Sequence, residues 1–335
     1  MTIKDIAKES GYSVGTVSRV LNNVPDVSEA ARNTIMEVVN KYHFQLNSNA
    51  KHLKKQSHDG IAIIIKGTQN MLFAAIVEQM QGIIKSKWYD CSVYYIEEDA
   101  NEVEQAVQIC VERRPLGILF LGSNLEYFRQ RFESITVPCV LVTNSASGLG
   151  YHNLSSVSTD DVAAAKFAVE HLISMGHHRI GILGGKIEMS HAGYARYLGC
   201  MQAFEEQQIS FDMAHQYEAA NFSISAGYYA MERLLEKMPD VTAVFAVSDV
   251  MAIGAIRAIN DRGMRVPDDI SVIGFDGVDI GRYMIPRLTT IRQHRESIVA
   301  RSVDILLRSI ENGEGAKHEL EPFHLIPGES VCRRA

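Results

Sequence analysis

The strongest constraint on the fold is a set of apolar segments that begins near residue 60 and recurs along the chain. Seven runs contain almost no polar residue: IAIII (61–65), CSVYYI (91–96), GILFL (117–121), CVLV (139–142), RIGIL (179–183), TAVFAV (242–247) and ISVIGF (270–275). Strands that are buried on both faces, as in a parallel sheet covered by helices, need such continuous apolar runs. Their alternation with helical segments therefore predicts a doubly wound α/β fold.

Amphipathic segments fill the intervals between these runs. The helices that they predict span residues 70–87, 102–113, 161–175, 195–208, 223–237 and 249–262. Four strand–helix units precede about residue 145 and three follow residue 156, which predicts two similar lobes. We expect an N-lobe of about 59–158 and 289–320, a C-lobe of about 159–288 and 321–335, and a ligand cleft where the carboxyl ends of the strands converge.

The first 56 residues differ in charge from the rest. They carry eight Lys or Arg and five Asp or Glu, a balance of +3, whereas the remainder carries 25 basic and 35 acidic residues, a balance of −10. A small basic segment on an acidic body is expected when only that segment meets a polyanion. The overall composition, with 46% apolar and 22% charged residues, is that of a packed globular protein and excludes a disordered or fibrous chain.

This basic segment, residues 1–46, has the pattern of a small all-α, helix-turn-helix domain. Thr2 and Asp5 resemble a capping box at the start of a first helix, and Gly11 supplies a residue that can end it with a positive φ. Two residues later Ser13 can cap a second helix, and a third begins near Ser28. The polar, basic segment 47–58 that follows is predicted to be a linker.

Several other classes of protein are disfavoured. The five cysteines are scattered and form no C-x-x-C pair, so neither a disulfide framework nor a zinc knuckle is indicated. No apolar run approaches the roughly 18 residues of a membrane span, and the start has no signal-peptide pattern, so we expect a cytoplasmic protein with no membrane contact. GILGGK (181–186) lacks the spacing of a phosphate loop, and no catalytic motif, metal set or cofactor motif is found.

Several blocks together resemble the lactose/galactose repressor (LacI/GalR) family of bacterial transcription regulators. They are TIKDIAKESGYSVGTVSRVLN (2–22), NAKHLKK (49–55), STDD (158–161), HLISMGHHRIGILGG (171–185), VFAVSDVMAIGAI (244–256), VPDDISVIGFD (266–276) and PRLTTIRQ (286–293). The resemblance covers essentially the whole chain. It implies a DNA-binding domain (1–46), a hinge helix (47–58) and a two-lobed, periplasmic-binding-protein-like domain (59–335) for effector binding and dimerisation.

A recognition helix must present side chains near its N-terminus to base edges in the major groove. The resemblance assigns this to Val14, Gly15 and Arg19. The residues expected to contact the DNA backbone are Thr2, Lys4, Thr16, Ser18 and Asn22. The guanidinium of Arg19 can bind guanine O6 and N7 together, worth roughly 1–3 kcal/mol of discrimination. The alternative for Arg19 is a solvated surface side chain.

In the linker, the resemblance assigns Leu53 to an apolar wedge that enters the minor groove of the operator, with Ala50 and Lys54 beside it. Such a wedge unstacks one base step, and wider contact with the bent duplex offsets the energetic cost of unstacking. The alternative for Leu53 is burial against the α/β domain. Leu46 stands where the family usually has proline, so a rigid stop before the hinge is absent.

In the cleft, the resemblance assigns ligand binding to Arg196 and Asp276, with Phe222 and Phe73 as stacking faces and Ser248 where some relatives have asparagine. An arginine fork and a carboxylate can satisfy neighbouring hydroxyls of a sugar, while an aromatic face covers its C–H side. The alternatives are an ordinary ion pair between the charged residues and plain core positions for the phenylalanines. Asp249 could cap the following helix.

These observations predict a transcriptional repressor rather than an enzyme. We expect a homodimer on a pseudopalindromic double-stranded operator, because one recognition helix reads only a few base pairs. A small effector, a sugar in preference to a nucleobase, would control operator affinity from the cleft. The alternative is a small-molecule receptor or α/β enzyme with no DNA-binding function, which the basic N-terminal segment disfavours.

Overall fold

The computed structural model describes residues 3–21, 27–42, 60–67, 70–187 and 191–334. The chain divides into two compact units, residues 1–58 and 59–335, which are considered separately. Within the described ranges, no helix is long and apolar enough to span a membrane.

The first unit is a three-helix domain with a small core. Its described helices are α1 (Ile3–Ser10), α2 (Val14–Leu21) and α3 (Glu29–Lys41). Gly11 has φ +74 at the end of α1, which confirms the predicted stop. The Oγ of Ser13 accepts a hydrogen bond from the backbone N–H of Thr16 at 3.1 Å, and Ser28 caps α3 in the same way through Ala31 at 3.4 Å. Ile6, Val17, Val20, Ile35 and Val39 are among the buried residues that hold the three helices together.

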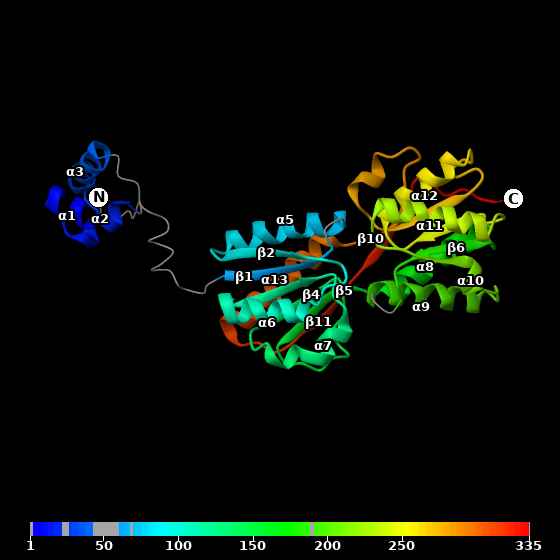
Figure 1. The fold of residues 1–335 in the computed structure, drawn as a ribbon, viewed down its shortest axis with the longest axis horizontal. Coiled ribbons are helices and arrows are strands. Elements are labelled where there is room, and N and C mark those ends of the chain that lie inside the picture. Colours follow the sequence, from blue (N-terminus) through cyan, green and yellow to red (C-terminus); the bar gives the residue numbers. More distant parts are fainter. Residues whose placement is uncertain (1–2, 22–26, 43–59, 68–69, 188–190, 335) are drawn as a thin grey trace. The chain divides into compact units, whose positions relative to one another are not determined.

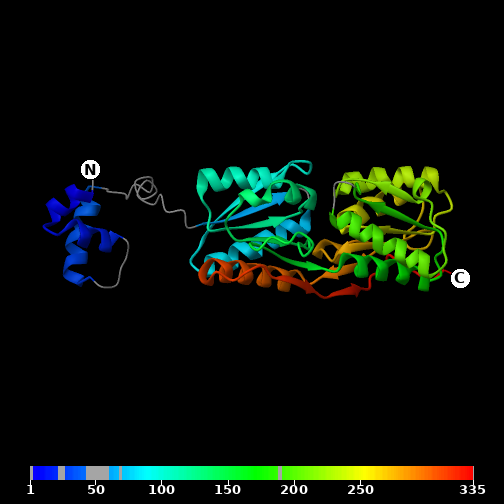
Figure 2. The same cartoon turned by 90° about the horizontal axis from the view of Figure 1, so that it is seen from below.

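The second unit consists of two lobes, each built on a six-stranded sheet (Figures 1 and 2). The N-lobe sheet has the order β11-β5-β4-β3-β1-β2, and the C-lobe sheet has the order β12-β10-β9-β8-β6-β7. The N-lobe strands are β1 (Gly60–Lys66), β2 (Asp90–Ile96), β3 (Gly117–Leu121), β4 (Cys139–Val142), β5 (Leu154–Thr159) and β11 (His318–Glu321). The C-lobe strands are β6 (Ile180–Gly184), β7 (Tyr217–Ala219), β8 (Ala243–Ala246), β9 (Ser271–Asp276), β10 (Thr289–Gln293) and β12 (Phe323–Ile326). Strand pairing is parallel except between β10 and β12.

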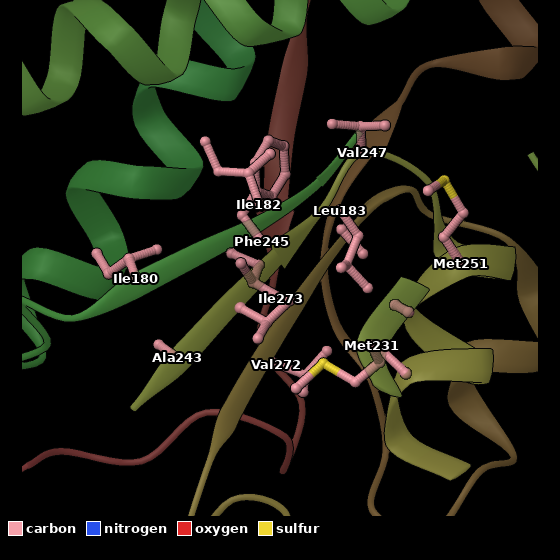
Figure 3. Close-up of a cluster of buried hydrophobic side chains, with 14 of the residues drawn as sticks. Ile180, Ile182, Leu183, Met231, Ala243, Phe245, Val247, Met251, Val272 and Ile273 are labelled. Atoms are coloured by element: carbon pink, nitrogen blue, oxygen red, sulfur yellow. The ribbon is translucent and has the colours of Figure 1, made fainter. Parts of the chain in front are cut away.

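Helices cover both faces of each sheet, which explains the continuous apolar strands. In the N-lobe, Ile63 of β1 packs towards α5 (Met71–Ser86) and α13 (Arg295–Asn312), whereas the next residue, Ile64, packs towards α6 (Glu102–Arg113) and α7 (Leu125–Arg131). The C-lobe has α8 (Asp161–Ser174) and α9 (His191–Glu206) on one side of the sheet in Figure 1, with α11 (Ile224–Lys237) and α12 (Asp249–Asp261) on the other. Its core contains the side chains labelled in Figure 3, among them Ile182, Phe245 and Ile273. The short elements are α10 (Met213–Gln216), η1 (Phe132–Ser134) and η2 (Asp279–Arg282).

The doubly wound α/β class is confirmed, but one lobe boundary is wrong. We expected the chain to return to the N-lobe at residue 289. In the structure β10 still belongs to the C-lobe sheet, because it pairs with β9 in parallel and with β12 in antiparallel register. The chain therefore crosses between the lobes after Thr159, after Gln293 and after Glu321, where one sheet ends and an element of the other lobe follows.

The close packing of α8 on α9 generates a prediction. A Cβ atom at Gly199 of α9 would lie 2.2 Å from the carbonyl oxygen of Val162 in α8, a clash that the backbone cannot easily relieve. Gly199→Ala should therefore lower the free energy of unfolding by about 1–3 kcal/mol, measured by urea denaturation. Gly82→Ala is the matched control, because a Cβ added at Gly82 of α5 would meet nothing within 4 Å and the helix should gain about 0.5–1 kcal/mol. Equal stabilities for the two variants would contradict this packing argument.

Candidate functional site

A cavity of about 830 Å³ lies between the two lobes of the second unit. Both lobes contribute to its lining, mostly from segments at the carboxyl ends of strands, as expected for parallel α/β sheets. The N-lobe residues are Lys66, Gly67, Asn70, Leu72, Phe73, Glu97, Glu98, Asp99, Gly122, Ser123, Thr143 and Asn144. The C-lobe residues are Lys186, Ala192, Arg196, Ala219, Ala220, Asn221, Phe222, Ser223, Ser225, Ala226, Tyr229, Arg233, Asp276 and Gln293.

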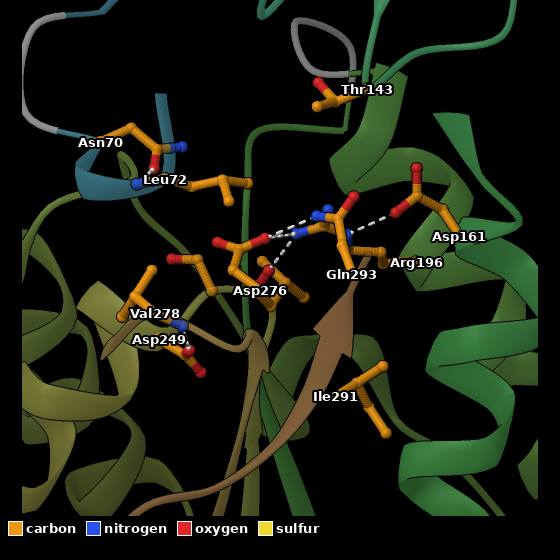
Figure 4. A network of polar contacts seen from close by, with 12 residues as sticks. Asn70, Leu72, Thr143, Asp161, Arg196, Asp249, Asp276, Val278, Ile291 and Gln293 are labelled. Carbon is orange, nitrogen blue, oxygen red and sulfur yellow. Dashed lines mark hydrogen bonds and ion pairs between the residues drawn. The ribbon is translucent and has the colours of Figure 1, made fainter. Parts of the chain in front are cut away.

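Arg196 of α9 is held rigidly in the cavity wall (Figure 4). Its Nε donates to Oδ1 of Asp161 at 2.8 Å, and its Nη1 donates to the carbonyl oxygen of Val247 and lies 3.6 Å from Oδ1 of Asp276. The guanidinium carbon also lies 3.7 Å from the ring centroid of Phe275. With 4% of its surface exposed, the arginine is held by contacts within the protein.

Asp276, at the end of β9, faces Arg196 as the resemblance implied. It has φ +115, an unusual conformation for a residue with a side chain, and Nε2 of Gln293 donates to its Oδ1 at 2.8 Å. Burial raises the pKa of this carboxyl to about 6, although Arg196 opposes the shift. The two residues both line the cavity and form an ion pair, and their binding of a ligand stays a prediction.

The roles expected for Ser248 and Asp249 require correction. Ser248 is fully buried and is not among the residues that line the cavity. Its Oγ accepts a hydrogen bond from the backbone N–H of Met251 and so caps α12. Asp249 is not that cap. Its carboxylate accepts from the hydroxyl of Thr290 at 2.6 Å and from the backbone N–H of Val278 at 2.7 Å, which ties α12 to β10 and to the segment after β9. Burial raises the pKa of Asp249, and the nearby Asp276 charge adds to that shift.

The two phenylalanines both line the cavity, and their stacking on a ligand stays a prediction. Phe73 lines the N-lobe side of the cavity and Phe222 lines the C-lobe side, and both are half-buried. Each also packs against the core of its own lobe. Their rings therefore serve the core and still present a surface to the cavity.

An ion pair between Lys66 and Glu102 was not anticipated from the sequence. Nζ of Lys66, at the end of β1, lies 2.9 Å from Oε2 of Glu102, and Oε1 of Glu102 accepts from the backbone N–H of Asn124 at 2.6 Å. Burial raises the pKa of Glu102 against the opposing effect of Lys66. The signal that could have revealed the site is the lysine that directly follows the apolar run 61–65. Among the described residues, no cluster of three or more His, Cys, Asp or Glu is placed to hold a metal.

In the first unit, α2 presents one exposed face. Val14 is 42% exposed, Gly15 and Arg19 are also exposed, and Thr16 and Ser18 are half-buried. Lys4 belongs to α1. The other residues expected to contact DNA lie outside the described residues, and so does Leu46: they are Thr2, Asn22, Ala50, Leu53 and Lys54.

Comparison with known proteins finds a family match in each of the two units. Residues 2–47 match the family model of bacterial regulatory proteins, lacI family, and residues 169–331 match that of a periplasmic binding protein-like domain. The chain is 33% identical to the HTH-type transcriptional regulator MalR of Clostridium butyricum, covering 98% of this chain and 99% of the relative. It is 28% identical to the HTH-type transcriptional repressor PurR of Haemophilus influenzae (strain PittEE), covering 100% and 98%.

Solved structures of regulators match nearly the whole chain. The Lac repressor dimer bound to operator and the anti-inducer ONPF matches with a TM-score of 0.81 and 25% identity over 99% of both chains. The complex of the transcriptional regulator CelR with cellobiose matches with a TM-score of 0.68 and 25% identity, covering 98% of this chain and 99% of the other. A helix-turn-helix unit joined to a two-lobed domain with a polar cavity defines a class of DNA-binding regulators. This chain belongs to the lacI family of bacterial regulatory proteins, and it is a DNA-binding transcriptional regulator rather than an enzyme.

The raised pKa of Asp276 predicts a pH-dependent stability. Between the ordinary pKa of 3.8 and the folded value of about 6, the folded protein binds a proton that the unfolded chain has lost, so stability falls as pH rises through this window. Asp276→Asn removes that loss and keeps the acceptor for Gln293. Urea denaturation from pH 4 to 7 should show wild type losing about 2 kcal/mol relative to this variant. The exposed Asp279→Asn is the control, and parallel pH profiles for wild type and Asp276→Asn would contradict the prediction.

Proposed function

We propose that this protein is a repressor that binds a pseudopalindromic operator as a homodimer in the cytoplasm, and that a sugar in the interlobe cavity controls its affinity for DNA. The observation that carries the proposal is the preorganised Arg196–Asp276 pair in a cavity flanked by two phenylalanine rings. The bound cellobiose of the CelR complex and the operator-bound dimer of the Lac repressor support it.

The cavity wall fits a sugar better than a purely apolar ligand. Arg196 offers donors and Asp276 offers acceptors, so adjacent hydroxyls can be bound together. Phe73 and Phe222 supply apolar faces from opposite lobes. A nucleobase would also stack on these rings, but the many hydroxyl and amide side chains of the lining favour a ligand with several hydroxyl groups.

The same arrangement couples the cavity to DNA binding in our proposal. Asp161 and Gln293 hold the ligand-binding pair and lie at two of the crossings between the lobes. A ligand between the lobes would therefore favour one closure angle, and the hinge segments 47–58 of two subunits would respond to it. Coupling of this kind typically amounts to about 1–3 kcal/mol.

The exposed face of α2 generates a prediction about DNA specificity. Arg19→Ala should weaken binding to the preferred operator by about 1–3 kcal/mol and relax preference at one base pair, because it removes a contact to a base edge. Lys4→Ala, which removes a charge expected to meet phosphate, should weaken all sequences equally and reduce the salt dependence. Competitive gel-shift assays with genomic fragments measure both effects. Unchanged selectivity in Arg19→Ala would refute this placement of the recognition helix, and the absence of any salt-sensitive shift in wild type would refute the proposed function.

Asp276 tests the placement of the effector. Asp276→Ala should reduce effector affinity at least about tenfold and abolish the response of operator binding, because it removes a buried acceptor from the cavity wall. Operator affinity without effector should stay close to wild type. The measurement is a titration of operator binding with the sugar that most raises the wild-type melting temperature, with exposed Asp279→Ala as control. A normal response in Asp276→Ala would remove this residue, and this cavity, from the effector site.

A further inference from the structure

Eight charged side chains line the interlobe cavity, four of each sign. The basic residues are Lys66, Lys186, Arg196 and Arg233, and the acidic residues are Glu97, Glu98, Asp99 and Asp276. What a ligand meets depends on which of these charges are already paired within the protein.

Three of the four basic side chains are committed to carboxylates. Lys66 pairs with Glu102 at 2.9 Å, and Arg196 pairs with Asp161 at 2.8 Å and with Asp276. Nε of Arg233 donates to Glu218 at 2.7 Å. The pairs of Lys66 and Arg196 are almost completely buried, so water does not weaken them. An anionic ligand would have to compete with carboxylates that cannot move into solvent.

The acidic side chains show the opposite pattern. Glu97, Glu98 and Asp99 follow one another at the end of β2, they are exposed, and the structure records no ion pair for them with a described residue. Of the four basic residues in the lining, Lys186 is the one for which the structure records no ion pair with a described residue. Among the described residues, the lining therefore has one cation and three carboxylates for which no ion pair is recorded. A cleft with low-dielectric walls strengthens the field of such an excess at its mouth.

We infer that the effector is an uncharged polyol, and that the cavity discriminates against sugars that carry a phosphate or carboxylate group. This rests on the proposed function, since it narrows the class of sugar. Uncharged partners are available at the wall: the hydroxyl of Ser123 is buried with no hydrogen-bond partner in the described structure, and Asn144 and Gln293 line the same cavity. A neutral hydroxyl can bind these groups without displacing a buried carboxylate.

The test compares sugars with their phosphate esters on the full-length protein. The pairs are glucose and glucose 6-phosphate, ribose and ribose 5-phosphate, maltose and maltose 6′-phosphate, and cellobiose and cellobiose 6′-phosphate. Thermal shift at pH 8 and constant ionic strength identifies the pairs that bind, and calorimetry gives their Kd. We expect a neutral sugar to raise the melting temperature and its ester to bind at least about tenfold more weakly, with a difference that shrinks at high salt.

Two variants of equal net charge test whether residues 97–99 cause the weaker binding of the ester. The triple variant Glu97→Gln, Glu98→Gln, Asp99→Asn removes the three negative charges of segment 97–99. We expect it to reduce the tenfold preference for the neutral sugar over its ester to about threefold or less. The control variant replaces three exposed glutamates outside the cavity with glutamine at positions 112, 133 and 205, and it has the same net charge. Equal loss of discrimination in both variants would overturn the inference.

Two further outcomes of the comparison between sugars and esters would contradict the inference. An ester that binds wild type as well as or better than its parent sugar overturns the inference and leaves the proposed function standing. If neither member of any pair shifts the melting temperature, the sugar class itself is contradicted, and the inference falls with it.

Discussion

The organisation of the cavity depends on one buried guanidinium. Arg196 carries a full positive charge at 4% exposure, a costly arrangement unless the charge is paired and hydrogen-bonded. Asp161 at the start of α8 and Val247 just after β8 accept hydrogen bonds from it, and Asp276 at the end of β9 forms an ion pair with it. Because these three segments all approach the same side chain, the carboxyl ends of the C-lobe strands are held in one geometry around the cavity.

Two further contacts connect that geometry to the interlobe crossings. Gln293, the last residue of β10, donates to Asp276, and Thr290 of the same strand donates to Asp249. The Arg196–Asp276 pair is thereby connected to the strand that leads directly out of the C-lobe into α13. The polar network shown in Figure 4 thus joins the cavity wall to the path between the lobes.

The two lobes contribute to the cavity in different ways. The C-lobe offers the buried Arg196–Asp276 pair, whereas the N-lobe offers the Lys66–Glu102 pair and an exposed acidic segment, residues 97–99. Ion pairing neutralises most of the buried charge of the cavity wall, and the exposed segment 97–99 adds negative charge. In the function proposed above, shape, hydroxyl contacts and this acidic segment select among ligands.

The sequence by itself determined the fold class and the general position of the site, since strands buried on both faces require continuous apolar runs and ligands bind at their carboxyl ends. It also indicated Arg196 and Asp276, through resemblance, and the cap Ser13 and the start of the third helix near Ser28, through local backbone chemistry. It did not reveal the polar strands, such as β5 with buried Ser156 and Ser158, or the membership of β10, because strand pairing joins residues far apart in the chain. Only the tertiary structure decided that Asp249 binds Thr290 of β10 and that Glu102 pairs with Lys66, because both depend on which distant atoms packing brings within hydrogen-bond distance.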